Sequence, residues 1–219
     1  MQTLAMPSIE GGPLKVLCVG AHSDDIEIGC AGTILKLICQ PRGAAVDWVV
    51  LGAGSKVRAS EARASASGLL REARSKRIII KGFRDGHFPF QGSAIKEYFE
   101  GLKRAQPDVI FVHSRRDLHQ DHRLACELTW QTFRDHLILE YEVPKWDGDF
   151  GSPNLFVELD ENAVRRKAEH ILHHFSSQGS RPWCTTDTFF GLARLRGMES
   201  RSPGNYAEAF YCRKLLWHL

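Results

Sequence analysis

The sequence predicts an α/β protein in which helices flank a mostly parallel β-sheet. Short apolar runs alternate along the chain with amphipathic stretches of helical length. The first run, LKVLCVG at residues 14–20, is almost continuously apolar and ends at a glycine, which is typical of a parallel strand buried on both faces. With 219 residues, of which 43% are hydrophobic and 25% charged, the chain suits one globular domain with a sizeable core.

The expected elements follow this alternation to the end of the chain. Further apolar runs predict strands at 45–54, 77–83 and 108–114, and three later segments are expected to extend or cover the sheet, at 138–144, 154–160 and 208–214. Amphipathic stretches predict helices at 30–39, 58–73 and 161–175, and a fourth within 119–137. We therefore expect a single Rossmann-like domain over residues 1–219, with residues 1–13 flexible.

Two short islands of His and Asp stand out from these ordinary segments. The first reads AHSDDIEIGCAGT over residues 21–33, and the second reads DLHQDHR over residues 117–123. Each follows an expected strand, and the loops at the carboxyl ends of parallel strands converge on one crevice. His22, Asp25 and His122 would together supply three ligands to one Zn²⁺ or similar divalent ion per chain. Three protein ligands leave an open position on the metal, as a hydrolase requires.

Both islands also carry acid–base groups beside these expected ligands. Asp24 precedes Asp25 and is the candidate general base, while His119 and Asp121 are further candidate catalytic groups. A structural metal site would need none of these three side chains. The alternative is that the first island forms only a helix N-cap and turn, where Asp is common.

These residues resemble the PIG-L/LmbE family of zinc-dependent de-N-acetylases. The family's first motif is AHPDD(x)E followed by GCGGT, matched here by residues 22–27 and 29–33, and its second is an HPDH-like element, matched by residues 119–122. Weaker matches to family motifs lie at 58–61, 82–86, 177–178 and 206–210. The resemblance thus covers nearly the whole chain.

The resemblance implies a zinc-dependent hydrolase that removes the N-acetyl group from an N-acetylated amino sugar. The sugar would be an N-acetylglucosamine-type unit, free or in a conjugate, whose amide is attacked by metal-bound water while His119 stabilises the tetrahedral intermediate. Arg58 is the candidate contact for a sugar hydroxyl or phosphate, with a surface salt bridge to Glu61 as its alternative. His87 and His113 lie where loops approach the pocket, so each is expected either to touch substrate or orient a ligand, or else to pack in a turn.

Three positions depart from the family pattern. Ser23 replaces a Pro, which loosens the turn between ligand and base. Ala31 replaces a Gly, so a positive φ there would strain the backbone. Asp117 stands where some members place a Tyr that helps the tetrahedral intermediate, so that contact would have to come from another residue.

Other functions use similar residues or a similar fold. An amidase acting on a larger sugar–thiol conjugate would use the same motifs, and a non-catalytic carbohydrate-binding module is a more distant alternative that needs no general base. A dinucleotide site is disfavoured because no GxGxxG follows the first strand. A two-metal phosphoesterase usually needs more ligands than the two islands hold.

The composition of the chain limits the kinds of partner that it is expected to bind. A net charge of +3 is too small to indicate nucleic acid, so the expected partner is a small-molecule or glycoconjugate amino-sugar substrate. No apolar run approaches the about 20 residues of an integral membrane segment, and the first residues do not resemble a signal peptide, so a cytoplasmic protein is expected. The six cysteines lack CxxC spacing and are expected to be reduced core residues.

Three segments are expected to form the rim of the pocket, at 84–93, 144–154 and 176–206. Their aromatic side chains suit stacking on a sugar face and are Phe88, Phe90, Trp146, Phe150, Trp183 and Tyr206. Another group of histidines, His170, His173 and His174, is expected to lie on an exposed helix face.

Overall fold

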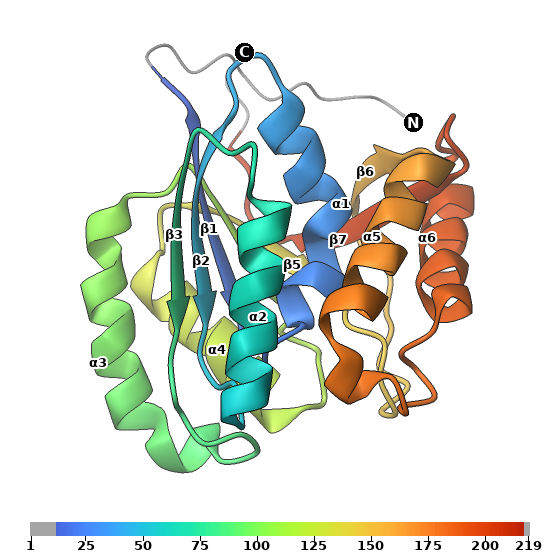
Figure 1. The fold of residues 1–219 in the computed structure, drawn as a ribbon. Coiled ribbons are helices and arrows are strands. Elements are labelled where there is room, and N and C mark those ends of the chain that lie inside the picture. Colours follow the sequence, from blue (N-terminus) through green and yellow to red (C-terminus); the bar gives the residue numbers. More distant parts are fainter. Residues whose placement is uncertain (1–11, 217–219) are drawn as a thin grey trace.

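Seven strands form one sheet in the order β3-β2-β1-β4-β5-β7-β6 (Figure 1). The computed structural model describes residues 12–216. The expected flexibility of residues 1–13 falls almost entirely on residues 1–11, which lie outside the described residues. The strands are β1 Leu14–Gly20, β2 Ala44–Val50, β3 Ser75–Ile80, β4 Val109–His113, β5 Leu137–Tyr141, β6 Leu155–Leu159 and β7 Tyr206–Cys212.

The first five strands are parallel, and only the C-terminal edge of the sheet is antiparallel. β1 pairs in parallel with β2 and β4, and β5 continues the parallel part beside β4. β7 runs antiparallel between β5 and β6. The predicted fold class, a mostly parallel sheet flanked by helices, is confirmed.

Helices cover both faces of the sheet (Figure 1). They are α1 Asp25–Cys39, α2 Lys56–Leu69, α3 Gly92–Leu102, α4 Gln120–Thr132, α5 Glu161–His174 and α6 Thr186–Ser200, with short 3₁₀ turns η1 Phe88–Gln91, η2 Lys103–Ala105 and η3 Ser176–Gln178. Val16 and Cys18 of β1 pack toward α1 and α2, whereas Leu17 and Val19 pack toward α3 and α4. The sheet is therefore buried on both faces, which explains its continuously apolar strands.

Two helices were missed in the sequence. No helix was predicted over α3, although its apolar residues at 95, 98, 99 and 102 have helical spacing. α6 lies within 176–206, which was expected to be rim, and shows no single apolar stripe because it packs against both β7 and α5. Within the expected rim, Phe88 is fully buried in the core and is not available to a sugar.

The helix α1 begins at the first island rather than after it. The predicted helix at 30–39 starts instead at Asp25 and is kinked at Cys30, whose φ is −149° and ψ is 15°. Gly29 leaves no room for a side chain, since an added Cβ would lie 2.2 Å from the ring of Tyr141. Ala31 does not have a positive φ, so the expected strain at this departure does not arise.

A buried carboxylate caps the second half of this helix. Glu208 accepts hydrogen bonds from the backbone N–H of Gly32 at 3.0 Å and from the N–H and hydroxyl of Thr33 at 2.6 Å each. Lys167 of α5 donates to the same carboxylate at 2.6 Å. We call Glu208, Lys167, Gly32 and Thr33 the Glu208 clasp. It links the motif at 206–210 to the first motif and so fixes the helix whose first turn carries Asp25.

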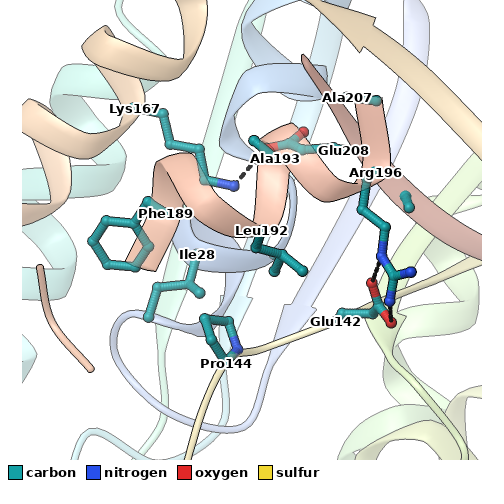
Figure 2. Close-up of a pocket in the computed structure, with 12 residues that line it drawn as sticks. Ile28, Glu142, Pro144, Lys167, Phe189, Leu192, Ala193, Arg196, Ala207 and Glu208 are labelled. Atoms are coloured by element: carbon teal, nitrogen blue, oxygen red, sulfur yellow. Dashed lines mark hydrogen bonds and ion pairs between the residues drawn. The ribbon is translucent and has the colours of Figure 1, made fainter. Parts of the chain in front are cut away.

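A second buried ion pair joins α6 to the end of β5. Arg196 binds Glu142 through both guanidinium arms, at 2.7 and 2.9 Å. Figure 2 shows this pair and the Lys167–Glu208 pair on opposite sides of a pocket lined by residues of α1, α5, α6 and β7. The pocket is lined by none of the expected metal ligands.

Candidate metal centre

Both islands lie at the carboxyl ends of neighbouring strands. β1 ends at Gly20, so the turn that follows holds His22 and Asp24, and α1 opens with Asp25. β4 lies beside β1, and the loop after it leads into α4, where His119 is the N-cap and His122 lies in the first turn. The parallel pairing of β1 and β4 therefore brings together residues that are about a hundred positions apart.

The three expected ligand atoms face one another. His22 Nδ1 lies 3.1 Å from His122 Nε2, and both lie close to Asp25 Oδ2, at 3.4 and 3.5 Å. A tetrahedral Zn²⁺ with bonds of about 2.0–2.1 Å to N and O ligands holds each ligand pair about 3.3 Å apart. The separations of His22, Asp25 and His122, here called the ligand trio, fit such an ion, and all three residues are buried.

Hydrogen bonds on the far side of each imidazole select the tautomer. His122 Nδ1 lies 2.8 Å from Asp117 Oδ2, and His22 Nε2 lies 3.3 Å from Asp121 Oδ2, so these two nitrogens carry the protons. His122 Nε2 and His22 Nδ1 then present lone pairs toward each other and toward the carboxylate of Asp25. A cation between these three atoms would accept a lone pair from each of them; without one, a proton on His22 Nδ1 can be shared with His122 Nε2 or Asp25 Oδ2.

The electrostatics of the trio favour a positive charge at this point. Burial lowers the pKa of His22, but Asp25, Asp121 and Asp85 raise it well above its ordinary value. Burial raises the pKa of Asp25, but His122, His113 and His22 hold it well below its ordinary range. For His122, burial and His113 dominate and lower the pKa to about 4, so this ring stays neutral and can bind a metal.

Asp24 is a buried carboxylate held by one guanidinium. Arg58 Nη2 donates to Asp24 Oδ1 at 3.0 Å, and its Nη1 lies 3.6 Å from Asp85 Oδ2. Burial and the adjacent Asp25 raise the pKa of Asp24, while Arg58 and His22 oppose them, and the result is about 6. A carboxylate with a pKa near neutrality is suited to accept a proton at physiological pH.

His119 is half-buried and stacks on His122, with ring centroids 4.6 Å apart. Its Nδ1 accepts the backbone N–H of Asp121 at 3.2 Å, so Nε2 carries the proton of the neutral ring. Burial and nearby His22 lower the pKa of His119. The ring is therefore a neutral hydrogen-bond donor, held by the backbone N–H of Asp121 rather than by a side-chain carboxylate.

Asp121 lies behind the ligands instead of in the crevice. Its side chain is fully buried and accepts the backbone N–H groups of Gly86 at 2.6 Å and Phe88 at 3.0 Å, besides facing His22. Burial raises its pKa, but these contacts hold it below the ordinary value. Because this carboxylate cannot reach a substrate, the geometry favours a positioning role over the catalytic role expected from the sequence.

The two expected substrate contacts differ in their placement. Arg58 lies in the site, and the alternative salt bridge to Glu61 is wrong, because Glu61 instead accepts the N–H and hydroxyl of Ser177, at 2.9 and 2.6 Å, and the hydroxyl of Ser176 at 3.2 Å. That contact attaches the segment after α5 to α2. His87 bonds the backbone of its own loop, through Nδ1 and Asp85 O at 3.1 Å, and within residues 12–216 it makes no hydrogen bond or ion pair with the ligand trio.

Several site residues were not found from the sequence. Asp85, in the weak motif match at 82–86, lies 3.1 Å from His22 Nε2. Asp117 was noted only as a departure, yet it binds His122 and also Lys145 at 3.1 Å. Burial raises the pKa of Asp117, but His122, His113 and Lys145 hold it well below its ordinary range. The weak motif match at 82–86 was the available signal for Asp85, whereas nothing in the local sequence indicates Lys145.

A comparison with known families identifies the chain. The sequence model described as "PIG-L: GlcNAc-PI de-N-acetylase" matches residues 17–133, a span that contains both islands. The chain belongs to the PIG-L family. The resemblance stated from the motifs is therefore confirmed.

Solved structures show how widely this fold is shared. The chain is similar to N,N'-diacetylchitobiose deacetylase from Pyrococcus horikoshii, with 22% identity, a TM-score of 0.70 and coverage of 90% of this chain and 82% of that one. It is also similar to GalB, the 4-carboxy-2-hydroxymuconate hydratase of Pseudomonas putida KT2440, at 19% identity, TM-score 0.72 and coverage of 94% and 99%. A third is the zinc inhibited form of teicoplanin deacetylase Orf2, at 13% identity, TM-score 0.67 and coverage of 90% and 97%.

Other sequence expectations can be compared with the fold. Over residues 12–216, no helix combines the length and apolar character needed to cross a membrane. All six cysteines are free, but Cys39 is exposed rather than part of the core.

His170 was expected to lie on an exposed helix face, but its side chain is hydrogen-bonded. Its Nε2 bonds Ser65 Oγ at 2.9 Å, and Ser65 in turn donates to the buried Glu27 at 2.5 Å.

Proposed function

We propose that this PIG-L family member is a metal-dependent hydrolase, with Zn²⁺ as the expected ion, that removes the acetyl group from an N-acetylated amino sugar. The observation that carries the proposal is the ligand trio together with Asp24 beside it. Three lone-pair donors converge at tetrahedral spacing, and a carboxylate of pKa about 6 lies next to one of them. A purely structural metal site would have no use for that carboxylate.

His22, Asp25 and His122 would hold the ion. When bound, Zn²⁺ polarises the acetyl carbonyl and lowers the pKa of a coordinated water toward about 7. Asp24 is positioned to accept the proton of the attacking water, and Arg58 keeps this carboxylate ionised and oriented. His119 presents its Nε2 proton as a donor to the developing oxyanion.

The departing amine needs a proton, and Asp24 is the side chain placed to return the one that it accepted. His119 is less suited to this step than the sequence suggested, because its pKa is lowered and its ring is neutral. We therefore assign the acid step to Asp24 and the stabilisation of the intermediate to His119. Asp117 and Asp121 act only through His122 and His22, by fixing their tautomers.

The names of two of the similar structures support a deacetylase, whereas GalB is named as a hydratase on the same fold. The reaction is therefore argued from the site and the family, not from the fold. Two alternatives remain: an amidase on a larger sugar–thiol conjugate would use the same trio, and a carbohydrate-binding module would release no product.

The test is to assay acetate release from N-acetylglucosamine units presented in four forms: free, nucleotide-linked, lipid-linked and within an oligosaccharide. We expect acetate from at least one form, loss of activity with a chelator, and recovery on adding Zn²⁺. Release of a larger acyl or amine product from a sugar–thiol conjugate, with none of the four yielding acetate, would favour the amidase. Metal-loaded protein that binds these sugars without turnover would overturn the enzyme assignment.

A further inference from the structure

The last residue of β4, His113, touches every segment that carries an expected metal ligand. Its side chain is fully buried. Nε2 lies 2.9 Å from the backbone N of Ala21, which precedes His22, and 3.2 Å from Asp25 Oδ2. The ring also stacks on His122, with centroids 3.8 Å apart and planes inclined by 20°. No substrate can reach this ring.

The surroundings of His113 fix the ring in place. The Tyr141 hydroxyl lies 3.3 Å from Nε2 and itself donates to Val19 O at 2.7 Å. Nδ1 is buried and has no hydrogen-bond partner within residues 12–216. An apolar side chain of similar size would avoid that unpaired atom. The polar contacts of the ring are therefore all made through Nε2, on the side that faces the ligand segments.

The hydrogen bond from Ala21 sets the tautomer of the neutral ring. Nε2 accepts the N–H of Ala21, so the proton is on Nδ1, and this contact fixes the turn that holds His22. Asp25 Oδ2 lies 3.2 Å from the same nitrogen. The face of the ring limits the tilt of His122, whose other nitrogen is held by Asp117.

We propose that His113 is a positioning residue that pre-organises the metal site by restraining all three ligands at once. It is not a fourth ligand, because the N–H of Ala21 points at Nε2, and a cation bound to Nε2 would face that hydrogen at close range. The inference rests on the proposed metal site but not on the identity of the substrate.

The test compares the Zn²⁺ affinity of wild type, His113→Phe and His113→Gln by competition with a chromophoric chelator. Phe keeps a ring against His122 but loses the polar contacts, so we expect about 10- to 100-fold weaker binding, the range seen when groups behind metal ligands are removed. Gln can accept from Ala21 or donate to Asp25, so it should recover part of the loss. At saturating Co²⁺, both variants should bind one ion per chain with the visible absorption bands of wild type.

Val112→Ala is the matched control, since Val112 is the fully buried neighbour on the same strand. It should lower the melting temperature without weakening metal binding. Unchanged affinity in His113→Phe would overturn the inference. Loss of the Co²⁺ bands, as in His122→Ala, would make His113 a ligand and also overturn it. If wild type itself binds no metal, the proposed function fails first, so the two failures are distinguishable.

Discussion

Two clusters of buried charge lie on α1, one at each side of its kink, and they are satisfied in opposite ways. In the Glu208 clasp, one carboxylate receives four donors at 2.6–3.0 Å, including the ammonium of Lys167. In the ligand trio, two imidazole nitrogens and a carboxylate oxygen face one another at 3.1–3.5 Å, and the backbone N–H of His22 donates to that oxygen at 2.6 Å. The first cluster is complete within the protein, whereas we propose that a cation completes the second.

The comparison distinguishes buried polar groups that hold the fold together from buried polar groups that prepare a binding site. Buried charges are normally paired and hydrogen-bonded, and a cluster that achieves this contributes a fixed geometry. A cluster that does not achieve it is strained unless a ligand completes it. Both kinds of cluster involve α1. The Glu208 clasp can therefore fix the position of this helix, while the start of the helix presents Asp24 and Asp25 to the crevice.

The largest expected effect is the loss of metal when the trio is broken. His122→Ala should reduce the metal content, measured by elemental analysis, from about one per chain to near zero. Glu208→Gln should instead leave Lys167 buried without its partner and lower the free energy of unfolding by about 3–5 kcal/mol. Its metal content should remain near one per chain where the protein is folded, as judged by circular dichroism.

These two variants are controls for each other. If Glu208→Gln lost its metal at temperatures where it is folded, the clasp would be part of the site, and the comparison would fail. If His122→Ala kept a full complement of metal, the ligand trio would be misplaced.

The next effect concerns turnover rather than binding. Asp24→Asn should keep its metal and lose about 10²- to 10⁴-fold in kcat, the usual contribution of a general base. Asp85→Asn is the matched variant, because it removes another carboxylate that faces Arg58 and His22. It should lose much less in kcat. Metal loss in Asp24→Asn would make Asp24 a ligand, and equal losses in both variants would remove the special role of Asp24.

The sequence was sufficient to predict that the three residues of the trio lie together, because each lies close to the end of a predicted strand. His22 and Asp25 lie in one turn after an apolar strand, and His122 follows another strand, so parallel pairing alone brings them together. The fold class was predictable for the same reason, since buried parallel strands are continuous apolar runs. The helix start at Asp25 was missed because the N-cap pattern and the metal site were treated as alternatives, whereas Asp24 is the N-cap residue by position although its side chain makes no capping hydrogen bond.

The clasp and the groups behind the ligands were not predictable from local patterns. Glu208 lies 175 positions from Thr33, and Lys145 reaches Asp117 from a different loop. No local sequence pattern indicates which distant charged residue will pair with a buried charge, because the pairing depends on the register of β7 and on how the helices pack. The weak motif matches at 82–86 and 206–210 identified the right segments without showing what Asp85 and Glu208 contact.

The smallest expected effect tests the partner of the general base. The sequence indicated Arg58 only as a contact for substrate, but its guanidinium donates directly to Asp24 at 3.0 Å. Its positive charge lowers the pKa of Asp24, which stands at about 6.

Activity requires the ionised carboxylate of Asp24, so activity is lost as pH falls through that pKa. A bound cation would attract the ionised form further, so we expect the acid limb at pH 6 or somewhat below it. Removing Arg58 should move this acid limb of kcat/KM upward by about 1 to 3 pH units. Arg58→Lys keeps the charge and should move it less. An unmoved acid limb with a raised KM would instead confine Arg58 to substrate binding and leave Asp24 without its proposed partner.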